Sequence, residues 1–149
     1  MEESDKNRID VQKKRERHFL SIKDISKTLF DDILERAESF QALQTREIKK
    51  LPLLRGKTVA NLFFEPSTRT RGSFEIAARY LGCNVINIDI ENSSEKKGES
   101  LIDTAKTIQS LGANVLIVRH GKKDTLKLIT NEIGEHCIVI NAGEANISH

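Results

Sequence analysis

The chain has 149 residues, a length that suits one domain able to bury a substantial core. Its 24 basic and 22 acidic residues leave a formal net charge of +2, which is too close to balance to recruit a nucleic acid by charge alone. Hydrophobic residues make up 38% of the chain, and no apolar run approaches the length of a membrane span. We therefore expect a cytoplasmic protein with neither a nucleic acid nor a membrane as its partner.

The N-terminal part of the chain divides into a charged tail and a helix. Residues 1–17 carry eleven charges of mixed sign and few apolar side chains, so we expect a solvated tail there and a domain that spans 18–149. From Ser26 onward, apolar residues recur at helical spacing, which predicts a helix that continues into residues 44–50. Pro52 and Gly56 then close it off.

Four short apolar segments and the helices between them define the predicted fold. Residues 58–64, 84–89, 114–118 and 137–140 have strand character. Apolar residues recur at helical spacing over 74–81, 101–111 and 123–133, with glycines directly behind at 82, 112 and 134. Ser100 and Asp103 resemble a capping box at the start of the second of these helices. This alternation predicts one α/β domain with a doubly wound parallel sheet of four or slightly more strands and helices on both faces.

The turn over residues 67–71, STRTR, lies between the first strand and its helix. Unpaired backbone N–H groups and the positive end of the helix dipole favour an anion at such a place, and the hydroxyls of Ser67, Thr68 and Thr70 add donors. The dipole contributes only about 0.3–1 kcal/mol at an exposed site, so an arginine must supply most of the charge. We assign that role to Arg69.

A plainer interpretation of the two arginines in this turn stays open. Arg69 and Arg71 could be surface ion-pair partners of Glu65 and Glu75, an arrangement that contributes little to stability. Arg71 lies two residues beyond Arg69 and could equally brace the loop. The density of hydroxyls and arginines in the turn favours the anion site.

Three further loops leave the carboxyl ends of the predicted strands, where ligands bind in such sheets. The loop ENSSEKKGES carries Lys96 and Lys97, which are either solvated or able to swing over a bound anion. Arg119 and His120 directly follow an apolar strand, and we rank Arg119 above His120 because a histidine there is more often structural. The segment NAGEANISH ends in His149. Polar chemistry in all four loops predicts a ligand site at this edge.

The cysteines and histidines do not predict a metal or cofactor site. Cys83 and Cys137 have no CxxC spacing, so we expect two free buried thiols. The four histidines form no paired-ligand pattern, and we therefore predict neither a metal nor another cofactor.

Several of these segments, taken in order, resemble a known family. FFEPSTRTRGSFEIAARYLG, SSEKKGES, VRH and NAGE followed by a histidine are similar to the carbamoyl phosphate-binding half of the aspartate carbamoyltransferases. The likeness runs from about His18 to His149. STRTR alone is typical of carbamoyltransferases in general, whereas FFEPSTRTR together with KGES resembles the aspartate enzymes more than their ornithine relatives.

The resemblance implies transfer of a carbamoyl group from carbamoyl phosphate to L-aspartate in pyrimidine biosynthesis, and it implies roles for single residues. The phosphate would be held by four neighbours in the turn: Ser67, Thr68, Arg69 and Thr70. Arg69 would also stabilise the charge on the departing phosphate. Arg119 would contact both the phosphate and the carbamoyl oxygen, and His149 would donate to that carbonyl together with Thr70.

The same resemblance implies a homotrimer whose sites lie between subunits. Ser93 and Lys97 would reach into the site of a neighbouring subunit, with Lys96 as the adjacent candidate. Family subunits are roughly twice as long as this chain, so we expect the aspartate-binding domain to be absent and the 149 residues alone to be inactive toward aspartate. A non-catalytic trimer-forming or phosphate-binding module and a fragment of an ornithine carbamoyltransferase stay open, and a regulatory subunit is not predicted either way.

Overall fold

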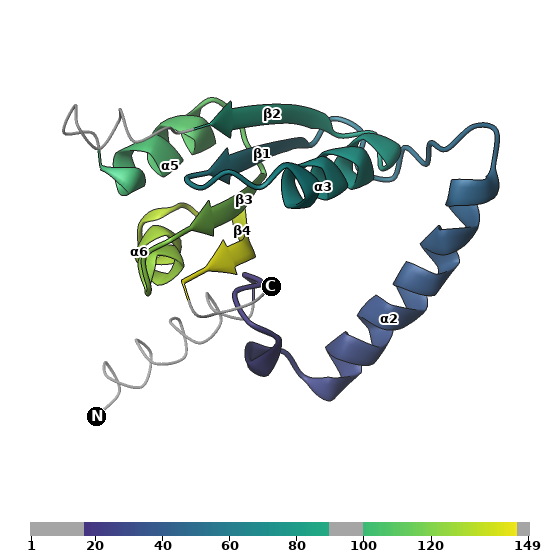
Figure 1. The fold of residues 1–149 in the computed structure, drawn as a ribbon, viewed down its shortest axis with the longest axis horizontal. Coiled ribbons are helices and arrows are strands. Elements are labelled where there is room, and N and C mark those ends of the chain that lie inside the picture. The colour runs from purple at the N-terminus through teal and green to yellow at the C-terminus, as the bar shows by residue number, and fades with distance from the viewer. Residues whose placement is uncertain (1–16, 90–99, 146–149) are drawn as a thin grey trace.

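The structure, a computed structural model, describes residues 17–89 and 100–145 (Figure 1). Its helices and strands follow one another as η1 (Ile22–Asp24), α2 (Lys27–Gln41), η2 (Ala42–Thr45), β1 (Thr58–Phe63), α3 (Thr68–Tyr80), β2 (Asn84–Asp89), α5 (Leu101–Ser110), β3 (Val115–His120), α6 (Thr125–Glu132) and β4 (Ile138–Glu144). The elements η1 and η2 are 3-10 helices.

The four strands form one parallel sheet in the order β2-β1-β3-β4. The predicted fold class is thereby confirmed. Strands β1 and β3 lie in the middle of the sheet and are almost wholly buried. A strand covered on both faces has no polar side, which is why these segments are nearly continuous apolar runs in the sequence.

Helices cover both faces of this sheet (Figure 1). On one face, α3 packs through Phe74 and Ala78 against Val59, Phe63 and Ile117. On the other face, α5 and α6 contribute to a larger cluster that includes Ala105, Ile108, Leu126, Ile129, Leu62, Leu116 and Val118. Each buried Leu or Ile contributes about 1.5–3 kcal/mol, so the two clusters fix the sheet that carries the loops at its carboxyl edge.

The N-terminal residues are attached to the outer side of β4. Of the predicted tail, only Arg17 is among the described residues, and its Nη1 donates to the carbonyl of Glu135 at 2.6 Å. The N–H of Val139 donates to Nδ1 of the buried His18 at 3.0 Å. Phe19 then makes a single parallel bridge to β4, so this segment extends the sheet at its edge.

The predicted helix ends are largely confirmed. Ser100 and Asp103 form a true capping box, in which Ser100 Oγ accepts from the N–H of Asp103 at 3.1 Å and Asp103 Oδ2 accepts from the N–H of Ser100 at 3.3 Å. Gly82 and Gly112 end their helices at φ +84° and +98°, the left-handed region that glycine favours. Gly134 is different, because its N–H donates to Gln109 Oε1 at 3.1 Å and a Cβ would lie 2.7 Å from Gln109 Nε2. The side chain of Gln109, not a left-handed turn, occupies the space beside that glycine.

Helix α2 is the predicted helix after Ser26, but it is shorter than expected. Ser26 Oγ accepts from the N–H of Leu29 at 3.1 Å and caps the helix. The helix ends at Gln41, and the prediction that it continues into residues 44–50 holds only as far as Thr45, through η2. At Arg46 the backbone is extended, with ψ 149°. The polar sequence that follows offers no apolar stripe that would hold a longer helix against the domain.

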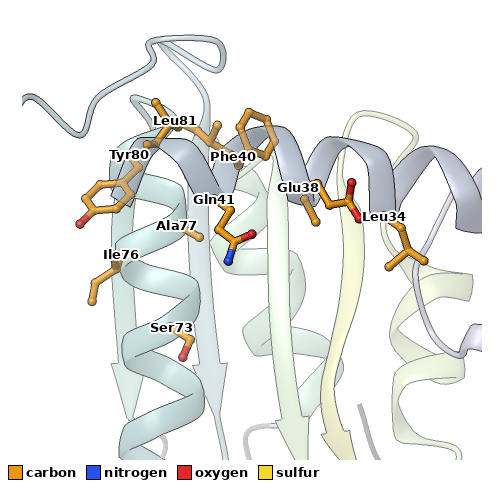
Figure 2. Close-up of a pocket in the computed structure, with 11 residues that line it drawn as sticks. Leu34, Glu38, Phe40, Gln41, Ser73, Ile76, Ala77, Tyr80 and Leu81 are labelled. Carbon is orange, nitrogen blue, oxygen red and sulfur yellow. The ribbon is translucent and has the colours of Figure 1, made fainter. Parts of the chain in front are cut away.

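An open groove of about 750 Å³ lies between α2 and α3 (Figure 2). Its walls are mostly apolar and include Leu34, Phe40, Ile76, Ala77, Tyr80 and Leu81. In Figure 2 the strand arrows point away from Tyr80 and Leu81, so the groove lies toward the starts of the strands. Along α3 the groove reaches Ser73, and none of residues 67–71 lines it.

The order of the strands reverses between β1 and β3. From β1 the chain moves outward to β2, then crosses back over β1 to β3 and on to β4. Such a reversal opens a crevice for ligands at the carboxyl ends of the two strands that flank it. Here the N–H of Phe64 donates to the carbonyl of Arg119 at 3.0 Å, which joins the two strand ends beside that crevice.

Candidate functional site

The first turn of α3 follows β1 at the reversal of strand order. Ser67 precedes the helix with φ −153°, and its side chain makes no capping hydrogen bond. The N–H of Arg71 donates to the Ser67 carbonyl at 3.0 Å, so the N–H groups of Thr68, Arg69 and Thr70 have no partner inside the helix. These N–H groups and the positive end of the helix dipole favour the binding of an anion at this turn, where the sequence predicts it.

Arg69 is one of the two arginines in this turn, and its side chain carries a full positive charge. It is exposed, and within residues 17–89 and 100–145 it forms no hydrogen bond or ion pair. A guanidinium can bind a phosphate through two parallel charge-assisted hydrogen bonds. Arg69 therefore supplies a fork of donors beside the unpaired N–H groups of the helix start.

Arg119 is the second arginine at the crevice, and it comes from β3. Its Cα lies in register with Phe63 of β1, its Nη1 donates to the carbonyl of Ala142 at 3.0 Å, and its Nε lies 3.6 Å from Oε2 of Glu65. The guanidinium thus spans from the end of β1 to the end of β4, with the side chain still 26% exposed. Glu65 pairs with Arg119 and not with Arg69. The plainer interpretation, in which the turn arginines are ion-pair partners of Glu65 and Glu75, therefore does not hold for Glu65.

The plainer interpretation also named Glu75 as an ion-pair partner, and Glu75 has hydrogen bonds to two neighbours. Its carboxylate accepts from Asn87 Nδ2 at 2.7 Å and from Arg79 at 2.9 Å. The hydrogen bond from Asn87 is the largest cause that lowers the pKa of Glu75, followed by the hydrogen bond from Arg79, and the charge of Arg71 adds to them. The charge of Arg71 thus acts on Glu75, which agrees with the plainer interpretation of this arginine as a partner of Glu75.

Two buried polar side chains at the same edge have structural partners. His120 Nδ1 accepts from the N–H of Lys122 at 2.9 Å, and its ring packs 4.8 Å from that of Phe64. Glu144 Oε1 accepts from the N–H of Leu126 at 2.9 Å, so β4 caps the start of α6. The sequence did not predict this cap, because it joins residues far apart along the chain.

The structure thus places the turn after β1 and Arg119 at the end of the neighbouring β3, so both lie at the reversal of strand order. The remaining predicted site residues lie outside the described residues: Ser93, Lys96, Lys97 and His149. Their roles stay predictions.

Sequence reasoning missed three residues beside Arg119: its ion-pair partner Glu65 and the two glycines Gly121 and Gly143. Glu65 was considered only as a partner of the turn arginines, yet it faces Arg119. A Cβ at Gly121 would collide with Oε1 of Glu65, and a Cβ at Gly143 would collide with Nη1 of Arg119. Glycines shortly after the carboxyl ends of two predicted strands were the available signal.

Over residues 17–89 and 100–145, no three His, Cys, Asp or Glu side chains gather closely enough to hold a metal ion. No helix in that part of the chain is long and apolar enough to cross a membrane. Cys83 and Cys137 are both buried free thiols, as predicted.

The arrangement of an anion-binding helix start and a second arginine at the reversal of a doubly wound sheet defines a phosphate-binding α/β domain. The family model for the aspartate/ornithine carbamoyltransferase carbamoyl-P binding domain matches residues 17–149. The chain belongs to this family.

Solved structures of aspartate transcarbamoylases are similar to the chain over most of its length. The enzyme from Trypanosoma cruzi in complex with carbamoyl aspartate and phosphate is 32% identical, with a TM-score of 0.77 over 91% of this chain and 43% of that chain. The same enzyme in complex with carbamoyl phosphate matches 91% of this chain and 41% of that chain at the same identity and TM-score, 32% and 0.77. The catalytic subunit from M. jannaschii is 40% identical, with a TM-score of 0.73 over 85% of this chain and 40% of that chain. The chain therefore spans less than half the length of these relatives.

Proposed function

We propose that the chain is the carbamoyl phosphate-binding half of an aspartate carbamoyltransferase, which transfers the carbamoyl group to L-aspartate and yields N-carbamoyl-L-aspartate and phosphate in de novo pyrimidine biosynthesis. The observation that carries this proposal is that the α3 start and Arg119 follow the two neighbouring strands at the reversal of strand order. Family membership narrows the anion to carbamoyl phosphate. The aspartate transcarbamoylases among the similar structures support aspartate over ornithine as the acceptor.

Binding of the phosphate group follows from the chemistry of the turn. The unpaired N–H groups of residues 68–70 and the hydroxyls of Ser67, Thr68 and Thr70 supply neutral donors, while Arg69 supplies a full positive charge. Arg119 approaches from β3 and adds a second guanidinium. Two arginines and a helix start together fit a phosphate dianion.

Catalysis in this proposal depends on donors that are already in place. Attack by the amine of aspartate on the carbamoyl carbon builds negative charge on the carbonyl oxygen, which then passes to the departing phosphate. Thr70, Arg119 and His149 would stabilise the oxygen, and Arg69 would stabilise the phosphate. The loss of one such donor typically costs about 2.7–4 kcal/mol of transition-state stabilisation.

The remaining parts of the proposal concern assembly and the acceptor. Ser93 and Lys97 are proposed to enter the site of a neighbouring subunit in a homotrimer, and the enzyme is proposed to work in the cytoplasm. We propose that the aspartate site belongs to the part of the relatives that these 149 residues do not cover, since the chain spans 43% and 41% of two of them. Purified alone, the 149 residues are expected to bind carbamoyl phosphate and to form no carbamoyl aspartate, and a measurable yield of that product would contradict this point.

Titration calorimetry with carbamoyl phosphate and with inorganic phosphate tests the proposal. The chain should bind both, and Arg69→Ala should lower the affinity at least tenfold with the circular dichroism spectrum unchanged, because the anion loses the guanidinium beside the helix start. Arg55→Ala is the matched control, since Arg55 is equally exposed but precedes β1 at the other edge of the sheet. Equal affinity of the two variants, or no binding by the unmodified chain, would refute the assignment.

A further inference from the structure

Strand β4 carries an extra residue opposite Arg119. Val118 pairs with Asn141 and His120 pairs with Glu144, so two steps along β3 face three steps along β4. Ala142 and Gly143 therefore form a β-bulge beside Arg119. Bulges of this kind are common next to functional sites, where they change the direction of a side chain or of a carbonyl group.

The bulge provides both a partner and a space for the Arg119 guanidinium. The carbonyl of Ala142 accepts from Nη1 at 3.0 Å. A Cβ at Gly143 would collide with that same Nη1 and would lie 3.1 Å from Cζ, and Gly143 also has φ +123°. The guanidinium thus occupies the volume that a side chain at position 143 would fill.

We infer that Gly143 is a positioning residue, which lets the bulge of β4 hold the Arg119 guanidinium in place for carbamoyl phosphate. The inference rests on the proposed function of this site. Gly121 has the matching role for Glu65, because a Cβ at Gly121 would collide with Oε1 of the carboxylate that lies beside Arg119. Neither glycine touches the substrate in this inference.

The surroundings of Gly143 determine which group moves when a side chain is added. Its N–H donates to Oδ1 of Asn141 at 2.8 Å, and Asn141 Nδ2 donates to the carbonyl of Leu20 at 2.8 Å. The backbone of the bulge is therefore held on two sides. The guanidinium is the far end of a flexible side chain, so a methyl group at position 143 is expected to displace Arg119 before it moves the bulge, while the positive φ of Gly143 adds backbone strain.

Displacement of Arg119 has a measurable cost because binding and catalysis need donors in fixed positions. A shift of about 1 Å in such a group can lower turnover about a hundredfold. We expect Gly143→Ala to lower the affinity for carbamoyl phosphate at least tenfold, as removal of the guanidinium would. A purely structural role for Gly143 would change the melting temperature and leave the affinity unchanged.

The test compares glycines that both have a positive φ but differ in their surroundings. Gly112 has φ +98° and a Cβ added there would meet no atom within 4 Å, so Gly112→Ala places an alanine at a positive φ away from the site. Calorimetry with carbamoyl phosphate should show weakened binding in Gly143→Ala and unchanged binding in Gly112→Ala. Gly121→Ala is a second variant without a left-handed φ, and it should weaken binding less than Gly143→Ala does.

A double-mutant cycle with Arg119→Ala tests whether Gly143 acts through that residue. If it does, adding Gly143→Ala to Arg119→Ala produces no further loss of affinity. Full additivity of the two losses, or unchanged affinity of Gly143→Ala in a chain that binds carbamoyl phosphate, would overturn the inference and leave the proposed function standing.

A crystal structure of the Gly143→Ala protein gives a result that does not depend on any ligand. A guanidinium moved away from the Ala142 carbonyl supports the positioning role, even if the unmodified chain binds no carbamoyl phosphate and the proposed function fails. A guanidinium that keeps its hydrogen bond to that carbonyl would refute the positioning role.

Discussion

His18 is buried against β4, where its imidazole is neutral, and low pH favours the protonated form that burial disfavours. Burial, followed by the charge of Arg17, lowers the pKa of His18 from its ordinary value of 6.5 to about 4. Between these values the unfolded chain binds more protons than the folded chain, so stability falls as the pH falls. The expected loss from this one group between pH 7 and pH 5 is about 2 kcal/mol. It should appear in urea unfolding curves measured at the two pH values.

The comparison that isolates this effect is His18→Asn. The amide oxygen of asparagine can accept from the N–H of Val139, as Nδ1 of His18 does now at 3.0 Å, but the amide does not titrate. The other groups of the protein contribute equally to both proteins and cancel in the difference. The variant should therefore lose less stability between pH 7 and pH 5, and identical pH dependence of the two proteins would disprove the assignment to His18.

Cys137 should be chemically silent in the folded protein. It is 0% exposed, and burial raises the pKa of its thiol to about 11. At pH 8 only about one thiol in a thousand is then the reactive thiolate. We expect iodoacetamide to label Cys137 slowly in native protein and rapidly in urea, as measured by mass spectrometry of the peptide that contains it. Rapid labelling of the native protein would show that this part of the core opens.

At the scale of single elements, the capping box of α5 gives a prediction of known size. Ser100→Ala removes the acceptor for the Asp103 N–H and should destabilise the protein by about 1 kcal/mol. For a chain of this length that corresponds to a fall of about 2–4 °C in the melting temperature. Ser110→Ala, at the exposed last residue of the same helix, is the matched control and should have almost no effect. Equal effects of the two changes would mean that the cap does not stabilise α5.

Helix α2 is expected to be the least protected of the long helices. None of its residues is buried, whereas α3, α5 and α6 each contribute buried residues to the core. Local opening of α2 therefore breaks few apolar contacts. In hydrogen exchange measured by mass spectrometry, its amides should exchange faster than those of α5. Equal protection of α2 and α5 would show that the groove of Figure 2 is covered in solution.

The sequence could predict the features that depend on local patterns, and it missed those that depend on pairing across the sheet. Alternating apolar segments predicted the parallel sheet, and a serine three residues before an aspartate predicted the cap of α5. The turn of residues 67–71 was found from its own composition. The bulge at Gly143 and the pairing of Glu65 with Arg119 arise only when β1, β3 and β4 lie side by side, so no local spacing marks them.

At the scale of the whole molecule, the candidate site and the α2 groove share no lining residue, so we expect local opening of α2 to leave the site unchanged. Carbamoyl phosphate contacts the start of α3 and Arg119 in our proposal, so it can be bound only while β1, β3 and α3 are folded together. At a ligand concentration one hundred times the dissociation constant, this linkage adds about 2.7 kcal/mol to the free energy of unfolding. Openings confined to α2 leave the site intact and gain nothing from the ligand.

Hydrogen exchange with and without carbamoyl phosphate tests this independence directly. Amides of β1, β3 and α3 should exchange more slowly in the presence of the ligand, while amides of α2 should keep their rates. The Arg69→Ala protein is the control, because a chain that no longer binds the anion should show no slowing in any element. If the ligand slowed exchange in α2 as strongly as in β1, opening of that helix would be coupled to the site, and the expected independence would be wrong.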